Sequence, residues 1–101
     1  MTKISRGAVL RTGNAYDTMT TGTIGAAFPA VAIYQEQLAC LEVLVQNDPA
    51  SASNALIGNR FGQSIVLVPG ASITIPINNV NKVWAGTAPG GGATINWIAM
   101  T

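Results

Sequence analysis

The stretch "SIVLVPGASITIPI", residues 64–77, decides the fold because two apolar runs flank a Pro-Gly pair. Proline presets φ at the first central position of a turn and glycine accepts a positive φ at the second, so residues 69–70 predict a type II turn. Residues 64–68 and 72–77 then read as two strands of a β-hairpin. Pro76 cannot donate to a ladder, so the second strand is expected at a sheet edge or to end there.

Strand-like alternation recurs on both sides of this stretch. In "ATINWIAM", residues 93–100, Ile95, Trp97 and Ala99 fall on one side of an extended chain. This spacing favours core packing for the tryptophan over an exposed sugar-stacking role. The run "ACLEVLVQ", residues 39–46, also has period two and predicts a half-buried strand. The residues on its more apolar face are Ala39, Leu41, Val43 and Val45.

Two shorter segments, "AVAIYQ" at residues 30–35 and "VNKVWA" at residues 80–85, also read as strands. Clusters of Gly, Pro and Asn separate the segments, and no stretch of ten residues has a helical period. The sequence therefore predicts an all-β fold, a compact β-sandwich or jelly-roll-like barrel of about six to eight short strands.

The N-terminal segment differs from the rest of the chain. Residues 1–28 are rich in Thr, Gly and Ala, and neither period persists in them. We expect an extended N-terminal arm over residues 1–28 and a β-sandwich domain over residues 29–101. The arm reads either as a loose terminal segment or as one that orders on a neighbouring subunit. Tyr16, Ile24 and Phe28 would be its apolar contacts.

Composition limits the function classes. Charged residues are only 9% of the 101 residues and hydrophobic residues are 49%, so part of the surface is expected to be covered by other chains. The net charge of +1 and five scattered basic residues argue against nucleic-acid binding. No apolar run approaches the ~18 residues of a membrane span. The first residues lack the apolar stretch of a signal peptide, so a non-secreted protein is expected.

The residues that carry most enzyme chemistry are missing. The chain has no histidine, which excludes Ser-His and Cys-His pairs and any zinc site that needs His. Its one cysteine, Cys40, is expected to be a small apolar residue beneath a sheet or between subunits. The four carboxylates form no telling pattern. The glycine-rich loop at residues 86–93 leads into a strand rather than a helix, unlike a phosphate-binding loop. We expect no enzymatic activity, no cofactor and no metal.

A polar break interrupts the strands in "VQNDPASASNALIGN", residues 45–59. Asn47 and Asp48, followed by proline, are explained by turn chemistry, and small residues then continue to Asn54. Such residues are poor at chemistry but can lie flat against another surface, so they form a candidate contact loop. Trp84, beside the glycine-rich loop in sequence, is the candidate exposed aromatic residue.

Three segments share a more specific arrangement: "LEVLVQNDPASASNALIGN", "SIVLVPGASITIPINNVNKVWAGT" and "ATINWIAM". This arrangement covers about residues 38–101. It resembles a small β domain common among structural proteins of tailed bacteriophages, found in capsid decoration (cementing) proteins and in tail and fibre proteins. The first 28 residues lie outside the resemblance.

The resemblance implies a virion component that is assembled in the host cytoplasm. The expected function is that of a homo-oligomeric decoration protein that stabilises a phage head, usually as a ring or trimer, with the major capsid protein or other virion proteins as partners. The alternative is a tail or fibre domain that recognises a host receptor or glycan. The candidate contact residues for these functions are Tyr16, Ile24, Phe28, Asn47, Asp48, Asn54 and Trp84.

Overall fold

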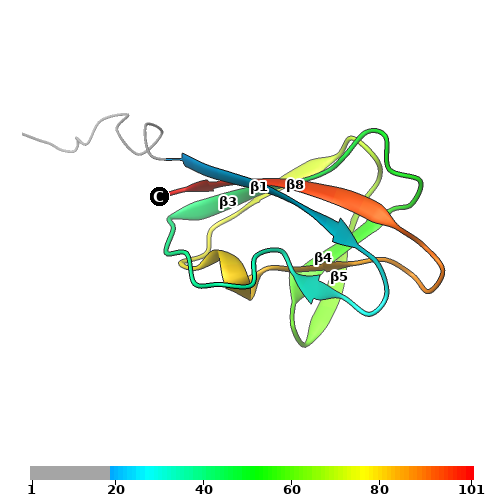
Figure 1. Ribbon diagram of the computed structural model, residues 1–101, viewed down its shortest axis with the longest axis horizontal. Coiled ribbons are helices and arrows are strands. Elements are labelled where there is room, and N and C mark those ends of the chain that lie inside the picture. The colour runs from blue at the N-terminus through cyan, green and yellow to red at the C-terminus, as the bar shows by residue number, and fades with distance from the viewer. Residues whose placement is uncertain (1–18) are drawn as a thin grey trace, which may run out of the picture.

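The computed structural model describes residues 19–101 as two four-stranded antiparallel sheets that pack face to face (Figure 1). The inward side chains of the two sheets form one apolar core. The predicted all-β sandwich is confirmed, with eight strands in the described part of the chain. The one helical element described there is a single 3-10 turn, η2 (Val80–Lys82).

The first sheet has the strand order β1-β8-β3-β6, and the second has the order β2-β7-β4-β5. Among the described strands, β4 and β5 are the one consecutive pair that lies in the same sheet, where they pair with each other. Every other described connection crosses from one sheet to the other. The strands are β1 (Met19–Ala26), β2 (Val31–Ala32), β3 (Glu42–Asn47), β4 (Ala55–Asn59), β5 (Gly62–Leu67), β6 (Ser72–Ile75), β7 (Trp84–Gly86) and β8 (Ala93–Met100).

Strand β8 lies between β1 and β3 and supplies the centre of the core. Ile95, Trp97 and Ala99, predicted to share one side, are all buried. The Tyr34 ring lies 5.4 Å from the Trp97 ring between centroids. Gly22 on β1 lies so close to the Trp97 indole that a Cβ there would collide with it. The core role predicted for Trp97 is confirmed.

The turn predicted within residues 64–77 is confirmed, but the hairpin is wrong. The Val68 carbonyl accepts the Ala71 N–H at 2.9 Å, and Gly70 has a φ of 90°, as a type II turn requires. The two flanking strands nevertheless join different sheets, since β5 pairs with β4 whereas β6 pairs with β3. This stretch is therefore a corner between the sheets. As Pro76 predicted, β6 is an edge strand and ends one residue before the proline.

Asn47, the last residue of β3, holds this corner. Its N–H donates to the Ala71 carbonyl at 3.0 Å, and its carbonyl accepts the Gly70 N–H at 2.7 Å. Its side-chain Nδ2 donates to the Leu67 carbonyl at 2.9 Å. Buried backbone groups need partners, and here β3 supplies them to the corner. The chain can therefore leave one sheet and enter the other without a hairpin ladder.

Two strand predictions were too long. Within residues 30–35 only the two residues of β2 pair. Residues 80–85 begin with the 3-10 turn, and only then does β7 start. The Asn79 side-chain oxygen accepts the N–H groups of Leu38 and Asn81 at 3.1 and 3.2 Å. Such side-chain bonds offer the backbone an alternative to a strand.

Strand β3 starts later than predicted. Val43 and Val45 are fully buried, as their alternation predicted. Leu41, expected on the same face, precedes the strand and is 59% exposed. Cys40 is buried, as expected of a small apolar residue, and its Sγ lies 3.1 Å from the Ile77 carbonyl oxygen.

Part of the expected N-terminal arm belongs to the sandwich. Residues 19–26 form β1, which pairs with β8 along all eight of its residues. The boundary expected at residue 28 therefore falls after the first strand of the first sheet. Residues 1–18 of the expected arm, including Tyr16, lie outside the described residues.

Candidate functional site

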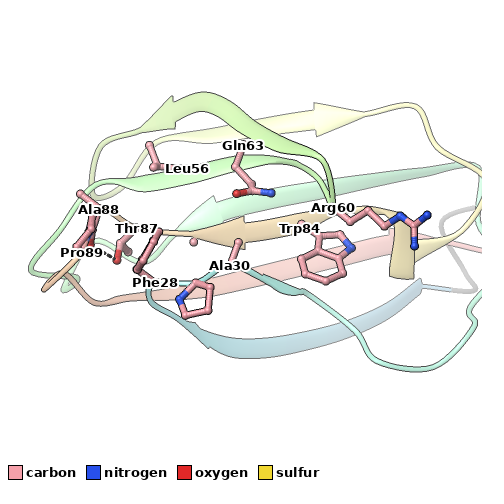
Figure 2. A pocket seen from close by; sticks show the side chains of 11 residues that line it. Phe28, Ala30, Leu56, Arg60, Gln63, Trp84, Thr87, Ala88 and Pro89 are labelled. Atoms are coloured by element: carbon pink, nitrogen blue, oxygen red, sulfur yellow. Dashed lines mark hydrogen bonds between the residues drawn. The ribbon is translucent and has the colours of Figure 1, made fainter.

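The outer face of the second sheet carries a surface cleft of about 540 Å³ (Figure 2). Trp84 from β7 and Arg60 from the β4–β5 turn lie beside each other at one end, and Gln63 from β5 lies nearby. Leu56 from β4 continues the floor toward the opposite end. The rim is formed by Phe28, Pro29, Ala88 and Pro89.

A glycine sets the local geometry of β4 between two residues that line this cleft. Gly58 on β4 stands opposite Trp84 on one neighbour and opposite Gln63 on the other. A Cβ at Gly58 would collide with the Gly62 carbonyl oxygen, because the β4–β5 register shifts at this point and brings the two backbones close. The absence of a side chain at Gly58 thus permits the bulge, which sets Gln63 opposite Gly58.

Two contacts fix the polar groups of the cleft. The Gln63 Nε2 donates to the Asn59 carbonyl at 2.6 Å. The Arg60 guanidinium carbon lies 4.6 Å from the centre of the Phe61 ring, a cation–π contact. The cleft thus offers a half-buried indole, an amide and a cation, which suit stacking and hydrogen bonding. It presents no carboxylate, thiol or imidazole among its lining residues.

The predicted contact loop and the glycine-rich loop meet at one end of the sandwich. The Ser51 Oγ accepts the Thr94 N–H at 2.9 Å, and the Ser53 Oγ accepts the Gly92 N–H at 3.1 Å. Asn54 is exposed and lines a shallow hollow between these two loops, together with Leu56. Two segments that are distant in sequence therefore present one small-residue surface.

Asn47 is not part of that surface. The sequence analysis placed it among the contact residues, but the structure buries it completely. Its Nδ2 donates to the carbonyls of Ser53 and Leu67, at 3.0 and 2.9 Å, and so ties the loop to the end of β5. Its Oδ1 has no hydrogen-bond partner. Asn47 is therefore a structural residue beneath the loop.

Asp48 begins the exposed part of the loop. Its Oδ2 accepts the Asn96 Nδ2 at 3.0 Å, and its Oδ1 accepts the Ala50 N–H at 2.8 Å. The hydrogen bond from Asn96, and then that from the Ala50 backbone, hold the pKa of the Asp48 carboxyl below its ordinary value. The turn chemistry predicted for Asp48 is confirmed by the second bond.

The structure brings together only some of the predicted contact residues. Phe28, 62% exposed, and Trp84 line the same cleft although they are far apart in sequence. Ile24 is half-buried on β1 and packs against the core. Ile24 does not line the cleft. The structure thus places Phe28 and Trp84 together in the cleft, and Asn54 on the loop surface.

The second sheet also has an exposed apolar strand edge that the sequence did not predict. Residues 64–68, "SIVLV", which we call the β5 edge, lie at the border of the second sheet. Ile65, Val66 and Val68 are 46, 55 and 54% exposed, and Phe61 at the tip of the preceding turn is 82% exposed. A continuous apolar run ordinarily indicates a strand that is buried on both faces. That signal predicts burial here, and only the sheet order shows that β5 lies at an edge of the described sheet.

Other site chemistry is limited in the described part of the chain. Within residues 19–101, no three or more His, Cys, Asp or Glu side chains gather in a way that could hold a metal ion. Burial raises the pKa of the Cys40 thiol above its ordinary value, so the group stays neutral and unreactive at neutral pH. The same residues form no helix long and apolar enough to span a bilayer.

Comparison of the chain with family models, with curated proteins and with solved structures gives no match.

Proposed function

We propose that this chain is a non-enzymatic structural protein that works by lying against other protein chains, including copies of itself. The observation that carries the proposal is the β5 edge, where apolar side chains stand exposed on a strand that has a neighbour on one side only among the described residues. Soluble proteins usually protect such edges with charges, prolines or covering segments, because an open edge pairs with other chains. Residues 62–68 contain no charged residue and no proline.

The specific form of the proposal is a virion protein, a homo-oligomer that decorates and stabilises the head of a tailed phage. It is supported by the resemblance of residues 38–101 to phage structural domains. It is supported also by the low charge of the chain and by the uncharged surface that the two loops make together. A decoration protein must cover a shell built of other proteins, and a surface of small uncharged residues can do so without strict charge matching.

Co-sedimentation tests this function. The purified full-length chain is mixed with assembled heads of tailed phages and, separately, with the matching free coat subunits. We expect the chain to pellet with heads, to raise their resistance to heat, and to ignore free subunits. Cryo-electron microscopy of heads with and without the chain would then show added density at repeated positions. A chain that stays monomeric at high micromolar concentration and binds no head contradicts the proposal.

The cleft around Trp84 favours a second candidate function, recognition of a receptor or glycan by a tail or fibre domain. A half-buried indole can stack on a sugar ring while Gln63 and Arg60 hydrogen-bond to its hydroxyls. A glycan array should then give signals that Trp84→Ala abolishes. The matched control is Trp97→Phe, which changes a core tryptophan outside the cleft. An array without signal argues against this function and leaves the structural one in place.

A further inference from the structure

The four strand edges of the sandwich differ in how well they are protected. Strand β2 is only two residues long. Strand β6 exposes Ser72 and Thr74, and Pro76 follows it directly. Strand β1 exposes mainly threonines along its length. The β5 edge alone exposes branched apolar side chains in the middle of the strand. Between the bulge at Ser64 and Pro69 it carries no charged residue and no proline, which are two of the usual devices against pairing.

The apolar surface of β5 continues into the sandwich. Val66 pairs with Leu56 and shares the outer face of the second sheet with it. Ile65 instead points toward the first sheet and lines a groove of about 390 Å³ between β5 and β6. Isoleucines dominate the lining of this groove: Ile57, Ile65, Ile73, Ile75 and Ile77. A strand added at β5 would therefore gain backbone pairing and apolar cover on both faces.

We propose that the β5 edge pairs antiparallel with the β5 edge of a second copy of this chain, about a two-fold axis at Val66. This inference rests on the proposed function, because it names the surface through which the chain self-associates. A two-fold contact closes with two copies. It joins the second sheets of both copies into one sheet of eight strands. The contact differs from the trimer that phage decoration proteins usually form.

The position of the axis follows from the strand itself. The β4–β5 register passes from Ile57–Ile65 to Gly58–Gln63, so Ser64 is the extra residue of a bulge and the regular edge begins after it. The part of β5 after the bulge, residues 65–67, is centred on Val66. Directly opposed residues of an antiparallel pair share a face, so Val66 meets its own copy on the outer face. Ile65 then meets Leu67 of the other copy at the groove.

Charge favours a second copy as the occupant. No charged residue lies within residues 61–81, so two β5 edges can approach each other without like-charge repulsion. Arg60, the nearest cation before the strand, would lie opposite residue 72 of the other copy, far from its own counterpart. The segment before β1, by contrast, carries Lys3, Arg6 and Arg11 against the single acid Asp17, and the groove already holds Lys82. Repulsion between these cations disfavours the N-terminal segment as the occupant of the groove.

The contact is small. A standard protein–protein interface buries about 800 Å² on each partner. A five-residue strand pairing with its flanking side chains covers less than that, so association is expected at micromolar rather than nanomolar concentration. The oligomeric state should therefore depend on concentration over the range that sedimentation velocity can follow.

Charge substitutions at the axis test the pairing in the full-length chain. Val66→Lys and Val66→Glu each place two like charges directly opposite one another, which destabilises a strand pair. Each variant alone should weaken self-association at least tenfold in sedimentation velocity. An equimolar mixture of the two should recover a dimer, because opposite charges now meet. The matched control is Leu41→Lys, an equally exposed apolar residue away from β5, which should associate like the unchanged chain.

A covalent trap gives an independent readout. In a Cys40→Ala background, Val66→Cys places two thiols across the axis, where opposed Cα atoms lie about 4.5 to 5.5 Å apart, within disulfide reach. With copper phenanthroline as oxidant it should give a dimer on non-reducing gels, whereas Leu41→Cys should not. An oligomer that is indifferent to both charge variants and untrapped by Val66→Cys overturns the β5 pairing but leaves the proposed function standing. A monomer at high micromolar concentration overturns both.

Discussion

Strands β5 and β6 are joined by one turn and border the same groove, yet β6 exposes polar side chains to solvent and β5 exposes apolar ones. Strand β6 turns its isoleucines inward, exposes Ser72 and Thr74, and ends before Pro76. Strand β5 exposes the apolar Ile65 and Val66 although, like β6, it contains no charged residue and has a proline, Pro69, after it. Both are edges of four-stranded sheets, so the fold alone does not explain the difference. The polar exposed side chains of β6 suit an edge that stays unpaired, whereas the apolar exposed side chains of β5 suit pairing with a further strand.

The largest expected loss of stability comes from a substitution at the β4–β5 bulge, which positions β5. Gly58→Ala should destabilise the chain by about 3 kcal/mol, because the new methyl group collides with the Gly62 carbonyl and overpacks the bulge. Chemical denaturation measures the loss. Gly62→Ala is the matched control in the same hairpin, since a Cβ there meets no atom within 4 Å. Equal losses in the two variants would show that the bulge does not position β5.

A smaller loss of stability is expected at Asn47, whose hydrogen bonds hold the corner between β5 and β6. Asn47→Ala should cost about 2 kcal/mol, because the Ser53 and Leu67 carbonyls lose their shared donor. The loss should loosen the corner, so amide exchange should accelerate at residues 68–71 more than in β8. Asn54→Ala, at an exposed position of the same loop, should leave stability unchanged within about 0.5 kcal/mol. A neutral Asn47→Ala would contradict the role assigned to this side chain.

The protection of β6 can be removed without disturbing the core. Pro76→Val restores an N–H at an exposed position after the strand, so stability should change by no more than about 0.5 kcal/mol. Self-association should rise modestly, because β6 then resembles β5. Sedimentation velocity compares the variant with Pro89→Val, an exposed proline in a loop. A variant that associates no more than this control would mean that the proline does not protect β6.

The smallest expected effect is the pH dependence from Asp48. The pKa of this carboxyl is lowered in the folded chain, chiefly by the hydrogen bond from Asn96, so the unfolded chain takes up the proton first as pH falls. The contribution of Asp48 is therefore full above its ordinary pKa of 3.8 and is lost as pH falls through the lower folded value. Because the side chain is exposed, the effect should be slight.

Melting curves from about pH 6 to pH 2.5 check the sign of this dependence. The melting temperature of the unchanged chain should exceed that of Asp48→Asn at the upper end of the range. The gap should close at the lower end. A gap that widens toward low pH would be inconsistent with the lowered pKa.

The sequence predicted local features well. The limits of β8, the burial of Ile95 and Trp97, and the turn at residues 69–70 all follow from alternation and from the φ preferences of neighbouring residues. The prediction failed where a choice of partner was needed. The same turn serves a hairpin or a corner, and the choice depended on Asn47, which lies 20 residues before Leu67.

For the candidate site, too, single residues could be selected from the sequence, but their neighbours in space could not. Trp84 and Asn54 were selected from the sequence as surface residues; Asn54 is exposed, whereas Trp84 is half-buried. Phe28, selected as an apolar contact of the arm, is exposed on the described domain. That Trp84 and Phe28 share a cleft, and that Asn47 is buried, could not be predicted. Both facts depend on which strands are neighbours, and no short-range signal in this chain specifies that.

The sequence by itself determined the all-β character, the turn geometry and the lack of histidine-based chemistry, because these depend on residue types and on neighbours along the chain. The tertiary structure alone decided which sheet each strand joined and which edge was left open. Partner choice is the difference: Ile65 and Ile73 are the same residue type on either side of one turn, but Ile65 pairs with Ile57 in the second sheet, whereas Ile73 pairs with Val45 in the first.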